Sequence, residues 1–122
     1  MIIKFPKDDR YFCWTRHIKN KMLLYALSES RIKRVYKSPK RKEGGVAPNT
    51  TAVMSRNDRR TKKEEIWVMY QKMPRSIRVR MISAWRYPGI SKSGKEIPIP
   101  QEISEELQDM ECILKSDKFM LS

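Results

Sequence analysis

Three arginines occur close together near residue 80, where they could bind phosphate. Apolar and basic residues alternate there, and successive side chains of a β-strand point to opposite faces. The alternation predicts one face that carries Arg78, Arg80 and Arg86. It places five other side chains on the opposite face: Ile77, Val79, Met81, Ser83 and Trp85. An ordinary solvent face of an antiparallel sheet is the alternative interpretation.

A second concentration of charge lies between Arg31 and Lys42, with seven basic residues and no acidic one. Charged side chains of this kind hold a phosphate backbone but do not read base sequence. We therefore predict a nucleic-acid-binding surface, whose candidate residues are Lys21, Arg31, Arg34, Lys37, Lys40, Arg41 and Arg78. A solvated helix face followed by a loop would have the same composition.

The net charge is unevenly distributed. The formal charge of the whole chain is +13, but residues 1–100 carry 25 Lys and Arg against 8 Asp and Glu, a net of +17, whereas residues 101–122 carry 2 against 6, a net of −4. A surplus of this size attracts polyanions by releasing their counterions. Nucleic acid is therefore the favoured partner. A membrane is disfavoured, because no helix pairs a basic face with a bulky apolar one.

The length of 122 residues indicates one domain with a modest core. We expect neither a membrane span nor a signal peptide, and hence a cytoplasmic protein. Cys13 and Cys112 are far apart and His17 is the only histidine. This composition favours buried thiols over a disulfide or a metal site, and it implies no cofactor.

The segment from residue 11 to residue 39 predicts a short strand followed by two capped helices. Thr15 stands at the N-cap position of the first helix and Ser28 at that of the second, while Pro39 cannot continue the second helix. Further strands are expected at residues 50–55, 66–71 and 77–85, the second of them central because it is apolar on both faces. Residues 43–49 read as a turn or loop. The pattern predicts an α+β fold, with two N-terminal helices on a small antiparallel sheet of about four strands.

The last part of the chain predicts an amphipathic helix that starts at Pro100. Its apolar side would carry Ile103, Leu107, Met110 and Leu114, and its acidic side Glu102, Glu105, Glu106 and Asp109. We divide the chain into a domain of residues 1–96 and a C-terminal extension of residues 97–122. The helix could close the core, form a homodimer contact, or shield the nucleic-acid site.

The segment from Phe12 to Arg86 resembles a small domain family of unknown function in the RelE/BrnT-like toxin superfamily. The matching positions, in order, are Thr15, His17, Lys21, Met22, Leu27, Ser28, Ile32 and Pro39. Residues 66–71 and 77–85 resemble the family's paired closing strands. The chain departs from the family pattern at Lys21, where arginine is usual, and at Tyr25-Ala26, where an Arg-Gly pair is usual.

The resemblance implies a RelE-like fold and a metal-independent endoribonuclease that cuts mRNA and is restrained by an antitoxin protein. Such a reaction needs a base for the ribose 2′-hydroxyl, cations for the phosphate and an acid for the leaving oxygen. The candidate catalytic residues are His17, Arg80, Arg86 and Tyr87, with Lys21 as a further donor. His17 lies in the first turn of a helix, and we favour a structural role for it, in which it caps, packs or hydrogen-bonds to the neighbouring strand.

Two other classes of function remain open. A non-catalytic RNA- or DNA-binding module would use the same basic face, with exposed Trp67, Tyr70 or Tyr87 available for base stacking. A structural protein would use its charge only to hold an acidic partner. Convergence of His17 with two arginines on one patch would favour the nuclease.

Overall fold

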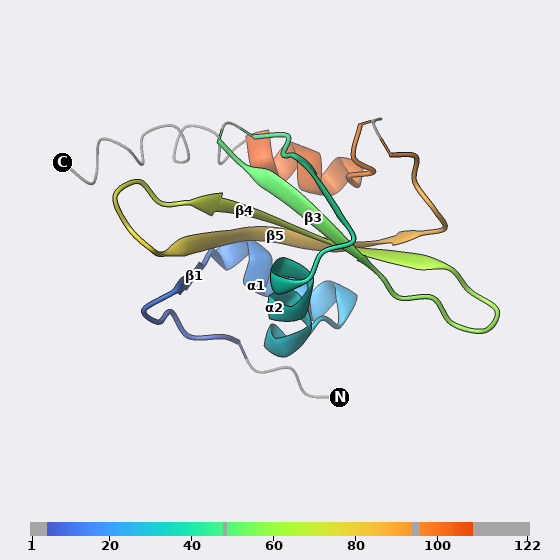
Figure 1. Cartoon of the computed structure of the whole chain (residues 1–122), viewed down its shortest axis with the longest axis horizontal. Helices are drawn as coiled ribbons and strands as arrows, with labels where there is room; N and C mark the ends of the chain where they lie inside the picture. Colours follow the sequence, from blue (N-terminus) through green and yellow to red (C-terminus); the bar gives the residue numbers. More distant parts are fainter. Residues whose placement is uncertain (1–4, 48, 94–95, 109–122) are drawn as a thin grey trace.

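The computed structural model describes residues 5–47, 49–93 and 96–108, and it places a five-stranded sheet between helices (Figure 1). Helices α1 and α2 cover one face, and a helix over residues 101–108 covers the other. The elements in chain order are β1 (Phe12–Trp14), α1 (Arg16–Tyr25), α2 (Glu29–Lys37), β2 (Arg41–Gly44), β3 (Thr51–Arg56), β4 (Glu64–Lys72) and β5 (Val79–Pro88). The expected α+β arrangement of helices on a sheet is confirmed.

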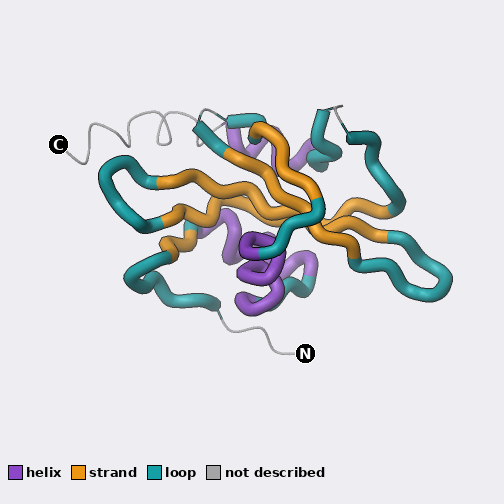
Figure 2. Tube along the Cα trace, in the orientation of Figure 1, coloured by secondary structure: helices purple, strands orange, loops and turns teal. Residues whose placement is uncertain are grey.

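The sheet differs from the predicted one in strand number and in direction. Its order is β1-β5-β4-β3-β2, and β1 pairs parallel to β5 while all other neighbours are antiparallel. The sheet is therefore mixed, with five strands instead of about four. Figure 2 shows the strands with helical segments on both sides of them. The missed strand is β2, which pairs with β3 where a turn or loop was expected. It is a short, charged edge strand, and such strands lack the apolar alternation that identifies a strand in sequence.

Both predicted helix starts are confirmed by capping hydrogen bonds. The Thr15 hydroxyl oxygen accepts a bond of 3.1 Å from the backbone N–H of Ile18, and the Ser28 hydroxyl oxygen accepts one of 3.2 Å from Arg31. Helix α2 ends at Lys37, two residues before the proline that cannot continue it. Helix α1 ends in a left-handed residue, Ala26, with φ 55° and ψ 51°.

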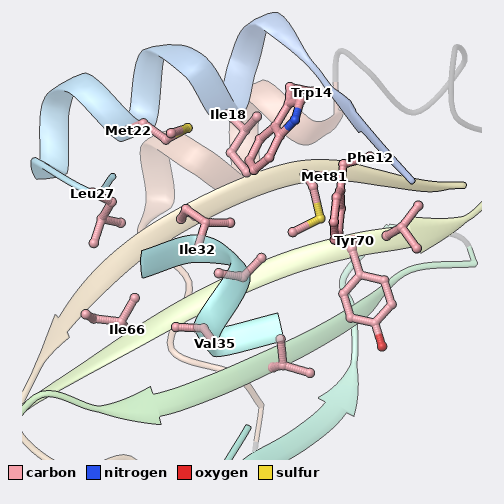
Figure 3. Packing of buried hydrophobic residues seen from close by; sticks show 14 residues of the cluster. Phe12, Trp14, Ile18, Met22, Leu27, Ile32, Val35, Ile66, Tyr70 and Met81 are labelled. Carbon is pink, nitrogen blue, oxygen red and sulfur yellow. The ribbon is translucent and has the colours of Figure 1, made fainter. Parts of the chain in front are cut away.

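The larger core lies between helices α1 and α2 and the sheet (Figure 3). Strand β4 is buried from Glu64 to Gln71, so its predicted central position is confirmed. Side chains from β1, both helices and strands β3 to β5 meet in this layer; among them are Phe12, Trp14, Ile18, Met22, Leu27, Ile32, Val35, Ile66, Tyr70 and Met81. The apolar spacing of the two helices, read from sequence, is what directs these side chains to the sheet.

A second core lies on the opposite face of the sheet. Ile97, Ile103 and Leu107 pack there with Trp67 and Trp85, whose rings stack at a centroid distance of 6.2 Å. The acidic helix thus closes the domain's own core, which was one of the three predicted roles. Its further predicted apolar positions, Met110 and Leu114, lie outside the described residues, as does Cys112.

A bulge in β5 changes the faces on which its side chains lie. Met69 pairs with Ser83 and Tyr70 pairs with Met81, so Ile82 is an extra residue opposite this step. Thr15 meets the bulge, since its N–H bonds the Met81 carbonyl at 3.2 Å and its hydroxyl donates to the Ile82 carbonyl at 2.8 Å. The bulge coincides with the end of β1 and the start of α1.

The predicted single arginine face of β5 is therefore wrong. Met81 packs in the core under α1 and α2, whereas Trp85 packs in the opposite core. Arg80, next to Met81, lies on the side of the second core, while Arg86, next to Trp85, lies on the side of helices α1 and α2. Strict alternation holds only on each side of the bulge.

Within the described parts of the chain, no helix combines the length and apolar composition that a membrane span requires.

Candidate nucleic-acid interface

The basic residues of α2 line a cleft together with the end of β3. The cleft has a volume of about 320 Å³, and its lining residues are Arg31, Arg34, Val35, Ser38, Lys40, Ser55 and Arg56. Helix α2 contributes the first three and its C-cap Ser38, Lys40 precedes β2, and the remaining two end β3. Four of the seven lining residues are cationic and none is acidic.

Three of these cations form no ion pair or hydrogen bond through their side chains with any residue that the structure describes. They are Arg31, Arg34 and Lys40; the last two are exposed and Arg31 is half-buried. Burial lowers the pKa of the Arg31 guanidinium, and the positive charges of Arg34 and Arg86 lower it further. Glu64 acts in the opposite direction, and an anion in the cleft would likewise favour the charged guanidinium.

The fourth cation, Arg56, is held in place by the strands around it. Its guanidinium donates to both carboxylate oxygens of Asp58, to Glu65 at 3.1 Å and to the Gly89 carbonyl at 3.3 Å. The hydrogen bond to Asp58, the largest contribution, raises the pKa of Arg56. Arg56 thus gives the cleft a fixed wall, whereas Arg34 and Lys40 are free to move toward a ligand.

The structure brings together only part of the predicted nucleic-acid surface. Arg31, Arg34 and Lys40 share the cleft, and Lys37 is exposed on the last turn of α2 but does not line it. Arg41 serves the fold instead. Its guanidinium bonds Glu43, Ser91 and the Lys92 carbonyl, and it lies over the Trp67 ring at 5.0 Å.

Two further predicted members lie elsewhere. Arg78 precedes β5 at the end of the sheet near β1, where its charge helps to lower the pKa of Asp9 after the larger contribution of hydrogen bonds from Phe12 and Tyr11. Lys21 is almost buried in α1, and its ammonium bonds Glu106 at 2.9 Å. Neither contributes to the lining of the cleft.

His17 lies in a hydrogen-bonded cluster beneath the C-terminal helix. Its Nδ1 is 2.7 Å from Glu106 Oε2, and its Nε2 is 2.7 Å from Ser83 Oγ. Burial is the largest effect on the imidazole and lowers its pKa; Lys21 acts in the same direction and Glu106 opposes both. The Ser–His–Glu order is that of a hydrolytic triad, but Ser83 is completely buried, so no substrate can reach its hydroxyl.

The four predicted catalytic residues do not share a site. Arg86 binds the end of α1 through the carbonyls of Tyr25 and Ala26, at 2.6 and 3.2 Å, and pairs with Glu64 at 3.2 Å. Arg80 bonds Gln71 of β4 at 3.2 Å. Arg80 precedes Arg86 by six residues in β5, and at the usual rise of a strand this separates the two arginines by about 20 Å.

Tyr87 packs partly buried against the second core, across the sheet from Arg86. The expected convergence of His17 with two arginines is therefore not found. The expected stacking surface is also wrong for Trp67 and Tyr70, which are 0% and 4% exposed. Most of the described aromatic rings pack in or against the two cores.

Sequence reasoning missed Arg56, Ser38 and Ser55 as members of the cleft. Each lies at the end of an element, and only the pairing of β3 with its neighbours and the packing of α2 bring them beside Arg31. The position of Arg56 directly after an apolar strand was the one available signal. Across residues 5–47, 49–93 and 96–108, no group of three His, Cys, Asp or Glu side chains is placed to hold a metal ion.

Comparison of the chain with models of known protein families, with curated proteins and with solved structures finds no match.

Proposed function

We propose that this protein binds nucleic acid through the phosphate backbone, in the cleft between α2 and β3, without cleaving it. The observation that carries the proposal is the gathering of Arg31, Arg34 and Lys40 around one cleft whose lining contains no carboxylate. Cations that lack protein counter-charges bind polyanions and release condensed counterions. The charge of +13 adds long-range attraction that brings a polyanion to this surface.

Of the two properties that the RelE/BrnT-like resemblance implies, we propose RNA binding and not RNA cleavage. The strand followed by two capped helices is the segment on which this resemblance rests. The cleavage step is left out, because His17 bonds Ser83 and Glu106 beneath a helix while Arg86 bonds the end of α1. An antitoxin partner would belong to the nuclease and is not part of the proposal.

Fluorescence polarisation with labelled 12-nucleotide RNA and DNA tests the proposal. If three or four phosphates are neutralised, raising the salt from 50 to 200 mM should weaken binding to a single strand by roughly 20- to 50-fold. The triple variant Arg31→Gln/Arg34→Gln/Lys40→Gln should bind at least about tenfold more weakly. Its salt dependence should be flatter by about two in the slope of log K against log salt.

A matched control removes the same charge from the other end of the sheet. Lys7, Arg10 and Lys72 are exposed, and Lys72 ends β4 at the end away from Arg56. The variant Lys7→Gln/Arg10→Gln/Lys72→Gln should lose less than about threefold in affinity, the share expected from net charge alone. Equal losses in the two triple variants would contradict a binding site in the cleft. RNA that is cut during the titration would restore the nuclease hypothesis.

A further inference from the structure

The size of the cleft limits what can enter it. Its volume of about 320 Å³ is at the lower end of the roughly 300–1,000 Å³ of small-molecule sites, which suits one nucleotide-sized group. Its floor is Val35, which is 1% exposed, and Arg31 and Arg56 are half-buried in its walls. A phosphate must enter the cleft to reach the half-buried Arg31 guanidinium.

The donors around the recess suit a phosphate group. Arg31 and Arg34 carry planar guanidiniums, which bind phosphate oxygens with two parallel hydrogen bonds, whereas most donors of Arg56 are taken by Asp58, Glu65 and the Gly89 carbonyl. Ser38 adds a hydroxyl to the lining as a neutral donor, while the Ser55 hydroxyl donates to the Ser38 carbonyl at 3.4 Å. Charged and neutral donors on several sides are what a tetrahedral anion needs.

The lining contains nothing that would recognise a base. No aromatic side chain is among its seven residues, and the nearby Tyr36 packs edge-on against Phe12 and Tyr70. Base recognition by single-strand-binding proteins depends on aromatic stacking, so bases of any sequence should be equivalent here. The cleft is a site for the backbone and not for the base.

We propose that the cleft is a binding site for one backbone phosphate of a single strand. This site, called the phosphate seat below, binds the backbone without regard to base sequence and prefers a single strand to a duplex. This inference rests on the proposed nucleic-acid binding and specifies the form of the ligand. A single strand can bend its backbone so that one phosphate and its sugar enter the recess. The phosphates of a duplex lie on a stiff cylinder, where they meet the exposed Arg34 and Lys40 but do not reach the half-buried Arg31.

A variant that fills the cleft without changing the charge tests the seat. Ser38 is exposed at the end of α2, and a tryptophan there would occupy the recess while the net charge stays at +13. Ser38→Trp should weaken binding to a labelled 12-nucleotide RNA single strand at least tenfold. The matched control is Ser76→Trp, in the exposed turn between β4 and β5, and it should change the affinity by less than twofold.

Competition experiments test the form of the ligand. An unlabelled single strand should displace the labelled one at a concentration at least tenfold lower than a duplex of the same length, and single strands of different base sequence should agree within threefold. Inorganic phosphate should shift the backbone NMR signals of Arg31, Ser38 and Arg56. Circular dichroism should confirm that both tryptophan variants are folded.

The possible failures are distinguishable. If Ser38→Trp binds as well as the unmodified protein while the Arg31/Arg34/Lys40 triple variant loses binding, the seat is overturned and the proposed function stands. Equal competition by single strand and duplex likewise overturns the seat. If neither the filled cleft nor the loss of the three charges affects binding, the proposed function and the seat fall together.

Discussion

Glu106 is a half-exposed carboxylate held by two nearly buried partners, the Lys21 ammonium and the His17 imidazole. The hydrogen bond from Lys21 is the largest effect on this carboxyl and holds its pKa below the usual 4.5. Burial lowers the pKa of His17 below 6.5. At neutral pH, an uncharged His17 therefore donates from Nδ1 to an ionised Glu106, while Nε2 accepts from Ser83.

The pKa shift of His17 sets a direction for stability against pH. As pH falls through 6.5, the unfolded chain binds a proton that the folded chain does not, so the free energy of unfolding should decrease until the lower folded pKa is reached. Glu106 adds a second loss below pH 4.5, where the unfolded chain binds a proton that the folded chain does not, until the lower folded pKa is reached. Both groups make the protein less stable in acid.

Because His17 is the only histidine, its imidazole NMR signals can be followed without ambiguity. We expect a titration midpoint below 6.5 and, in urea unfolding, a decrease in stability between about pH 7 and pH 5. In Lys21→Met the midpoint should rise, because the charge of Lys21 helps to lower it. A midpoint at or above 6.5 in the unmodified protein would contradict the buried position of this side chain.

Arg86 joins three elements, so its replacement should affect folding. It bonds the carbonyls that end α1, and it compensates Glu64 of β4, whose side chain is only 9% exposed. Removing one partner of a buried pair leaves the other charge unpaired. Arg86→Met should therefore lower the free energy of unfolding by about 2–4 kcal/mol.

The double variant Arg86→Met/Glu64→Gln separates the two effects of that change. It should recover part of the loss, since the unpaired carboxylate is gone although the contacts to α1 are still missing. Urea unfolding measures both variants. Unchanged stability in Arg86→Met would make the side chain available for a ligand, as the nuclease hypothesis requires.

At the scale of elements, the connection from β2 to β3 depends on one close approach. A Cβ atom at Gly45 would clash with the Thr50 hydroxyl, which itself donates to the Ala47 carbonyl at 2.6 Å. Gly45→Ala should therefore destabilise the protein by about 1–3 kcal/mol, because the hydroxyl cannot move without losing its bond. Gly44→Ala is the matched control, since no atom lies within 4 Å of its added Cβ. In thermal unfolding, Gly45→Ala should melt at a lower temperature than Gly44→Ala. Equal melting temperatures would contradict this geometry.

The elements that sequence predicted well are those encoded by local chemistry. The hydroxyls of Thr15 and Ser28 cap helices through backbone bonds only three residues away, and apolar spacing identified the buried faces. The bulge at Ile82 was not predictable, because it depends on where Thr15, 67 residues earlier, meets the strand. The candidate site had the same limit. The charge of α2 was visible in sequence, whereas its partner Arg56 was placed by sheet pairing.

At the scale of the whole molecule, the two ends of the charge distribution have different roles. The basic residues that line the cleft beside α2 belong to the positively charged part of the chain, residues 1–100. The acidic helix of residues 101–108 lies on the other face of the sheet (Figure 1). Its Glu102 and Glu106 accept hydrogen bonds from α1. Tyr25, one of its partners, donates to Glu102 at 3.4 Å. The described part of this helix therefore binds α1 and leaves the cleft open, in contrast to the expected shielding role.

The helix of residues 101–108 also tests whether the second core stabilises the whole protein. Ile103 is completely buried against a sheet face that carries Trp67 and Trp85. Ile103→Ala should lower the free energy of unfolding by about 2–5 kcal/mol, as expected for a large apolar side chain removed from a packed core. Glu105→Ala, on the exposed side of the same helix, should change it by less than about 0.5 kcal/mol. If the helix is integral to the domain, far-ultraviolet circular dichroism and tryptophan fluorescence should report one shared transition in urea for each variant. Two separate transitions, or no loss in Ile103→Ala, would instead make residues 97–108 an independent extension of a domain that is already complete at residue 96.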